Sequence, residues 1–237
     1  MGASAADWFN AASEGDVSQL RRLRSFGLAD MLEDAPMRGF AAVHYAALFR
    51  RAAALEFLAA HEGARLTSCH AKLRIREGRQ VVFPPGMSYQ HVLAATGQLD
   101  VLQRRLDLDG VVPGAFPLLS VLAVVGNAPF IRRNLPALLD DVCCAPGLCT
   151  NPAVIAVVLG DRKLVHTLLE QPHAAAAWMR ADAQQRLGDH SRTFEFHQLR
   201  PLFRGFLEFD NAKQALCSSP RAAASIPAMR SFCLAAQ

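Results

Sequence analysis

The chain has 237 residues, of which 51% are hydrophobic and 19% are charged, and its formal net charge is +4. This composition excludes a wholly disordered chain, because disorder requires low hydrophobicity and high net charge. Aromatic residues make up only 8%, so the apolar content is mostly Ala, Leu and Val, which favours helices. The weak positive charge does not by itself indicate nucleic-acid binding.

Cysteine usage points to a reducing compartment. The six cysteines are irregularly spaced, and no two of them form a CxxC pair. A chain of this length does not need disulfides to hold its fold, and a structural zinc site is poorly supported. We therefore expect a cytoplasmic location, no metal and no cofactor.

The first part of the chain contains three copies of one pattern, in which a helical stretch with a small-residue pair precedes a second apolar stretch. The copies begin at Trp8, Gly39 and Gly86, and weaker copies begin at Pro117 and Asn151. The pairs start at positions 11, 46, 93, 122 and 156, so they are 35, 47, 29 and 34 residues apart. Three separations are near a period of about 33 residues, and the value of 47 marks an insertion.

This pattern resembles the ankyrin repeat, which has a glycine, a Thr-Pro-Leu-His tetrapeptide, an Ala-Ala pair, a second glycine, an apolar second helix and Gly-Ala. The resemblance covers roughly residues 6–172. It implies an all-α fold, namely an ankyrin-repeat solenoid with one β-hairpin insertion and a helical C-terminal cap. The expected organisation is repeats over 1–172, with the insertion at about 65–85, and a cap and tail over 173–237.

Two histidines fall on the tetrapeptide histidine of that family. They are His44 and His91, whereas Ser120 and Val154 replace the histidine in the last two copies. The resemblance implies that both rings hydrogen-bond backbone in the turn, so we interpret them as structural.

The insertion predicts a β-hairpin, because Lys72–Arg76 and Arg79–Phe83 alternate partly around Glu77-Gly78. Its basic residues, which include Arg74, Arg76 and Arg79, are either a solvated loop or a contact to an acidic partner.

Val111–Ile131 carries no charge over a length that would span a membrane. Prolines and glycines interrupt it, so we expect a buried helix from Leu118 and no transmembrane segment. Beyond the repeats, Ala174–Leu187 and the aromatic-rich His197–Phe209 are expected to be helices. A loosely ordered tail is expected from Cys217.

The ankyrin resemblance also implies a concave partner-binding face along the first helices. Several of the implied positions are large and apolar, which would make an unusual exposed patch. Either a partner or the C-terminal segment covers them. The predicted concave face comprises Phe40, Leu48, Phe49, Met87, Thr96, Val124, Val125, Val158 and Leu159.

Arginine pairs recur in the middle of the second helices of the first, third and fourth copies. Stacked repeats would align them as a basic stripe suited to acidic peptide tails or anionic lipid, and a solvated face is the simpler interpretation. Without interleaved aromatics, nucleic acid is the least favoured partner. The predicted stripe comprises Arg21, Arg22, Arg104, Arg105, Arg132 and Arg133.

No motif for phosphate binding, a nucleophile elbow or a zinc protease occurs in the chain, so we expect no enzymatic activity and no catalytic residues. Asp140 and Asp141 are expected to be solvated turn residues. The adjacent Cys69 and His70 would point to opposite faces of a strand and form no dyad there.

The expected function is a protein–protein interaction module. The opening Asp7–Asp16 resembles the starts of ankyrin-only cytoskeletal proteins of flagellated protists, which favours a structural or scaffolding component of a microtubule-associated assembly, with acidic tubulin tails on the stripe. The alternative is a soluble regulator or effector that binds and inhibits one discrete protein through the concave face. A homo-oligomer through the same face is a further possibility.

Overall fold

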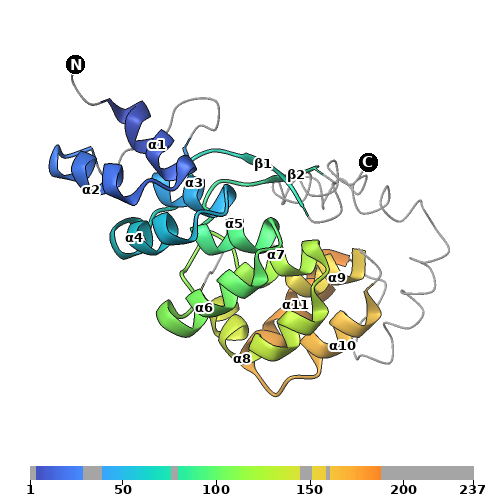
Figure 1. Ribbon diagram of the computed structural model, residues 1–237. Helices are drawn as coiled ribbons and strands as arrows, with labels where there is room; N and C mark the ends of the chain where they lie inside the picture. The colour runs from blue at the N-terminus through green and yellow to red at the C-terminus, as the bar shows by residue number, and fades with distance from the viewer. Residues whose placement is uncertain (1–3, 29–38, 76–79, 145–150, 159–160, 188–237) are drawn as a thin grey trace. The chain divides into compact units, whose positions relative to one another are not determined.

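The computed structural model describes residues 4–28, 39–75, 80–144, 151–158 and 161–187, which are mostly helical (Figure 1). The chain divides into two compact units, residues 1–115 and 116–237. The boundary between the units falls between the third and fourth copies of the sequence pattern.

The described part of the first unit contains three helix pairs and one hairpin. The first helices contact one another in order, α1 with α3 and α3 with α5, and the second helices α2 and α4 also touch. Their bounds are α1 Ala5–Glu14, α2 Val17–Ser25, α3 Ala42–Leu48, α4 Ala52–Glu62, β1 Ala71–Arg74, β2 Gln80–Phe83, α5 Tyr89–Ala95 and α6 Leu99–Asp109.

Helix α1 shows how local sequence sets these elements. Ser4 and Asp7 form a capping box, in which each side chain accepts a hydrogen bond from the other residue's backbone N–H. Gly15 ends the helix in the left-handed conformation that lacks a steric penalty for glycine. The buried Ala11 and Ala12 allow α1 to approach α3 closely.

A buried carboxylate joins the first two pairs. Glu62, at the end of α4, is almost fully buried. Its Oε1 accepts a hydrogen bond from Trp8 Nε1 at 3.0 Å, and its Oε2 accepts one from the Val43 backbone N–H at 2.9 Å. The same side chain therefore satisfies a donor at the start of α3 and holds the indole of the neighbouring pair.

The predicted hairpin is present as an antiparallel pair with Ala71 opposite Phe83 and Arg74 opposite Gln80. Alternation places Leu73 on its buried face and Arg74 on its exposed face. The predicted finger residues Arg76 and Arg79 lie outside the described residues.

In the described part of the second unit there are two further helix pairs and a helix that packs on them. Helix α11 matches the expected Ala174–Leu187, whereas the expected helix His197–Phe209 and the tail lie outside the described residues. The bounds are α7 Leu118–Val125, α8 Ala128–Cys144, α9 Pro152–Val158, α10 Arg162–Leu169 and α11 Ala174–Leu187. Helix α7 is buried along its whole length and contacts α8 and α9.

The expectation that Asp141 is a solvated turn residue is wrong. Asp141 lies inside α8, is nearly buried, and accepts a hydrogen bond from the Leu118 backbone N–H at 2.8 Å. Burial raises the pKa of this carboxyl to about 6, although the Leu118 hydrogen bond opposes the rise. Its neighbour Asp140 is exposed, as helical geometry requires of adjacent residues on a half-buried helix.

Among the described helices, none is long and apolar enough to cross a membrane. The uncharged stretch from Val111 forms the short buried helix α7, in agreement with the sequence analysis.

The two hydrogen bonds of Glu62 give a testable prediction for stability. Glu62→Gln places an amide NH2 group against one of the two donors, Trp8 Nε1 or Val43 N, and leaves that donor unsatisfied. We expect the free energy of unfolding to fall by about 1–3 kcal/mol in urea denaturation. The control is Glu56→Gln on the exposed face of the same helix. Equal stability of the two variants would contradict the proposed role of Glu62.

Candidate protein-binding surface

In each of the first four helix pairs, the turn between the two helices contains one residue in the left-handed conformation. Gly15 and Gly97 fill this position in the first and third pairs, with φ of 85° and 72°. In the second pair the residue is Arg50, with φ of 60°, and it is the single non-glycine residue with positive φ among those described. A side chain in this conformation carries a steric cost that glycine avoids.

In the second and third pairs, the residue that follows the left-handed one links neighbouring pairs. Arg51 Nε donates to the Ser13 carbonyl at 2.7 Å, and Gln98 Nε2 donates to the Ala47 carbonyl at 2.5 Å. Neither side chain caps its own helix. These long side chains reach the preceding turn, whereas the shorter Asp16 caps α2 by accepting from the Gln19 N–H.

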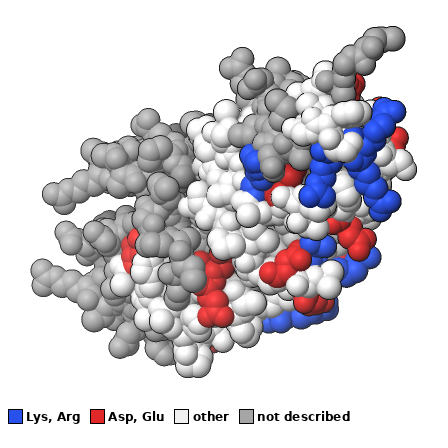
Figure 2. Space-filling view, turned by 90° about the vertical axis from the view of Figure 1, so that its left-hand side faces the viewer, with Lys and Arg blue, Asp and Glu red and all other residues white. Residues whose placement is uncertain are grey.

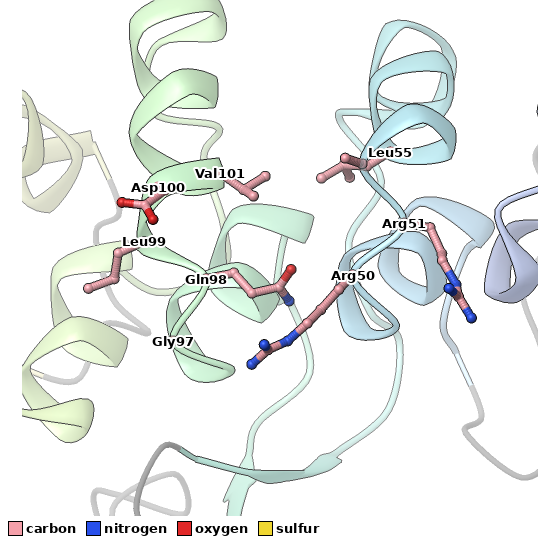
Figure 3. A pocket seen from close by; sticks show the side chains of 9 residues that line it. Arg50, Arg51, Leu55, Gly97, Gln98, Leu99, Asp100 and Val101 are labelled. Carbon is pink, nitrogen blue, oxygen red and sulfur yellow. The ribbon is translucent and has the colours of Figure 1, made fainter.

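A groove of about 260 Å³ opens between these turns and the starts of α4 and α6. Figure 3 shows Leu55 and Val101 directed toward one another from the two helices, with Arg50 extending past Gln98. Arg51 turns to the opposite side in this view, toward the first pair. The groove is therefore apolar between the helices and polar at the turn. It is lined by Arg50, Arg51, Ala52, Leu55, Gly97, Gln98, Leu99, Asp100 and Val101.

Phe49 lies immediately before this turn and is 47% exposed. Its ring stacks on that of Tyr45, with centroids 6.3 Å apart and planes at 10°. Tyr45 in turn contacts Phe9 and Phe40 inside the unit. The exposed ring thus rests on a buried aromatic cluster that limits its freedom.

The structure places the predicted concave-face residues in three different environments. Leu48 is the last residue of α3 and Thr96 directly follows α5, and both are half-buried. The side chain of Val158 and the whole of Leu159 lie outside the described residues.

Four predicted concave-face residues are buried, and the prediction that they bind a partner directly is wrong. Phe40 packs on the His44 and Tyr45 rings inside the first unit. Met87 is fully buried, and its carbonyl accepts from His44. In the second unit, Val124 and Val125 are each only 9% exposed, on a helix that is apolar on every side.

The two predicted structural histidines are fully buried and bonded to the turns before their helices. His44 Nδ1 accepts from the Ala41 N–H at 3.0 Å, so the proton sits on Nε2, which donates to the Met87 carbonyl at 3.1 Å. The equivalent His91 accepts from the Ser88 N–H at 3.2 Å. Burial lowers the pKa of His44 to about 4, so the ring is neutral near pH 7.

Five of the six arginines of the predicted basic stripe have exposed side chains. Arg21, Arg22 and Arg104 are exposed in the first unit, and Arg132 and Arg133 are exposed in the second. Figure 2 shows Lys and Arg side chains gathered on one side of the visible face, with Asp and Glu side chains between several of them.

Arg105 departs from the stripe. Its side chain is only 12% exposed, forms an ion pair with Asp109 one turn later, and donates to the Tyr89 hydroxyl at 3.3 Å. The Tyr89 hydroxyl also donates to Asp109 at 2.6 Å. The Arg105 guanidinium therefore stabilises its own helix pair, and its assignment to a partner-binding stripe is wrong.

The groove and the buried carboxylates were missed by sequence reasoning. The signal for the groove was an arginine at position 50, where other copies carry Gly15, Gly97 and Gly126. Within the described residues, no cluster of three or more His, Cys, Asp or Glu side chains is placed to hold a metal ion.

No protein-family model matches the chain, and no curated protein matches it.

The neutral, buried His44 predicts acid sensitivity. Its pKa is about 4 in the folded chain and 6.5 when unfolded, so stability is full above pH 6.5 and falls as pH drops toward 4, by about 3 kcal/mol from this group. Urea unfolding followed through Trp8 fluorescence in a Trp178→Phe background measures this. His44→Gln should flatten the pH dependence, while the exposed His70→Gln should leave it unchanged. A His44→Gln profile as steep as that of the parent would contradict the assignment.

Proposed function

We propose that the chain is a non-enzymatic protein-binding module built on an ankyrin-type stack of helix pairs. The second and third pairs support this through equivalent features 47 residues apart, such as His44 and His91. Gly39 and Gly86 both have positive φ, and in each case an added Cβ would collide with the residue 29 positions later, Ser68 or Ala115. Such matched close contacts are expected of stacked repeats.

The observation that carries the proposed binding function is the exposed Phe49 ring. Aromatic side chains held rigidly on a surface are typical binding hot spots, because they bury a large area at low entropic cost. Phe49 directly precedes Arg50 in the chain, and Arg50 lines the groove. We infer that a discrete partner protein docks on the first unit around Phe49.

Phe49→Arg tests this inference. The variant should fold with a urea midpoint near that of the parent, because the ring is nearly half exposed, and should bind the partner at least about tenfold more weakly. The partner is identified by purifying the tagged chain from its source cells, and affinity is then measured with the purified pair.

Phe26→Arg is the matched control, since Phe26 is 64% exposed at the end of α2. Unchanged partner affinity in the Phe49 variant, or an equal loss in the Phe26 variant, would overturn the inference. A marked loss of stability would mean instead that the ring is buried by another part of the chain.

A second candidate function is a scaffold on an acidic filament surface such as tubulin. It is favoured by the exposed guanidinium groups of Arg22, Arg104, Arg132 and Arg133, which are suited to carboxylate-rich tails.

Reversing charge at Arg104, Arg132 and Arg133 tests the scaffold candidate. We expect weaker co-sedimentation with microtubules, and the same loss when the acidic tubulin tails are removed by proteolysis. Phe49→Arg serves as the contrasting variant, since it should not affect binding by the stripe. Unchanged sedimentation after the reversal would eliminate the stripe as the contact.

A further inference from the structure

Arg50 combines an unfavourable backbone conformation with an accessible charge. Its φ of 60° is the conformation that Gly15, Gly97 and Gly126 adopt at the corresponding turns. Strain of this kind is concentrated at functional sites, where the side chain gained outweighs the conformational cost. The Arg50 side chain is exposed, and its hydrogen bond to the Thr96 carbonyl is long, at 3.5 Å. That bond is too weak to explain the presence of arginine at this turn.

We propose that the groove between α4 and α6 holds an acidic segment of a partner protein, with a carboxylate on Arg50 and a short apolar side chain between Leu55 and Val101. This proposal rests on the protein-binding function proposed above and specifies the chemistry of the partner.

The guanidinium is what points to a carboxylate. The planar fork of arginine donates two parallel hydrogen bonds to a carboxylate, and lysine does not reproduce this geometry. The neighbouring Arg51 adds positive charge, although its Nε is already committed to the Ser13 carbonyl. Asp100 is the one acidic residue among those lining the groove, and Figure 3 shows it directed away from Leu55 and Val101.

The size and walls of the groove point to a peptide side chain. Its volume of about 260 Å³ is below the range of typical small-molecule pockets. Leu55 forms a buried floor and Val101 a half-buried wall, so an apolar side chain of modest size is the matching occupant. Gln98 is held by the Ala47 carbonyl and by Thr96 Oγ1, which fixes the polar edge beside Arg50.

The competing interpretation is that Arg50 merely ties the second pair to the third through Thr96. The variant Arg50→Gly distinguishes this structural role from the proposed binding role, because glycine removes the backbone strain along with the guanidinium. If the role is only structural, the variant loses stability and its peptide affinity is unaffected. If the groove is a binding site, the urea midpoint is maintained or raised while binding is lost.

The experiment is an NMR titration of the full-length, 15N-labelled chain with the peptide acetyl-Gly-Gly-Leu-Glu-Gly-Gly-amide. The matched peptide carries Gln in place of Glu. We expect amide shifts at Gly97, Gln98 and Val101 with the Glu peptide, and at least about tenfold weaker binding of the Gln peptide. Arg50→Gly and Arg50→Lys should both weaken binding of the Glu peptide, the former more strongly.

The charge control is Arg104→Gln, which removes an exposed guanidinium of the same unit that does not line the groove. Equal binding of the two peptides, shifts elsewhere on the unit, or full binding by Arg50→Gly would overturn the proposal. Its failure is distinguishable from failure of the protein-binding function. If Phe49→Arg abolishes partner binding and Arg50→Gly does not, the partner docks without using the groove.

Discussion

The constraint behind the first unit is that its helices are too short to be stable alone. Helices α3 and α5 have seven residues each, well below the length of about 12 residues at which isolated helices become marginal in water. Six residues of α3 and all seven of α5 are buried. Helices α3 and α5 therefore exist because neighbouring pairs cover them, and on these two helices a partner can reach only the ends and the turns that follow.

Burial on this scale forces polar groups into the interior, where each needs a partner. Glu62 satisfies backbone at the start of α3 together with the indole of Trp8, and His44 connects the turn of its own pair to Met87 of the next. The bonds to Trp8 and Met87 cross between pairs, so they fix the register of one pair on another as well as contributing stability. In the second unit, Asp141 of α8 accepts a hydrogen bond from the Leu118 backbone N–H at the start of α7, so this bond lies within a single pair.

The sequence predicted the helix pairs, the hairpin and α11 because each is encoded locally, by small-residue pairs, turn glycines and alternation. It failed where a residue's environment is set by another pair. Phe40 and Met87 follow turn glycines and looked accessible, but the neighbouring helices cover them. Arg105 looked like the exposed Arg104, yet the two point to different sides of α6 and only Arg105 meets Tyr89.

His44 in the first unit and Asp141 in the second are both buried, and protonation of these two groups has opposite effects on stability in acid. As pH falls below 6.5, His44 binds a proton in the unfolded chain but not in the folded one, and this lowers the free energy of unfolding of the first unit. Over an overlapping range below about pH 6, Asp141 binds a proton in the folded second unit before it would when unfolded, and this favours folding. Mild acid thus shifts the balance of stability from the first unit toward the second. Through these two groups, mild acid acts against the unit that carries Phe49 and Arg50.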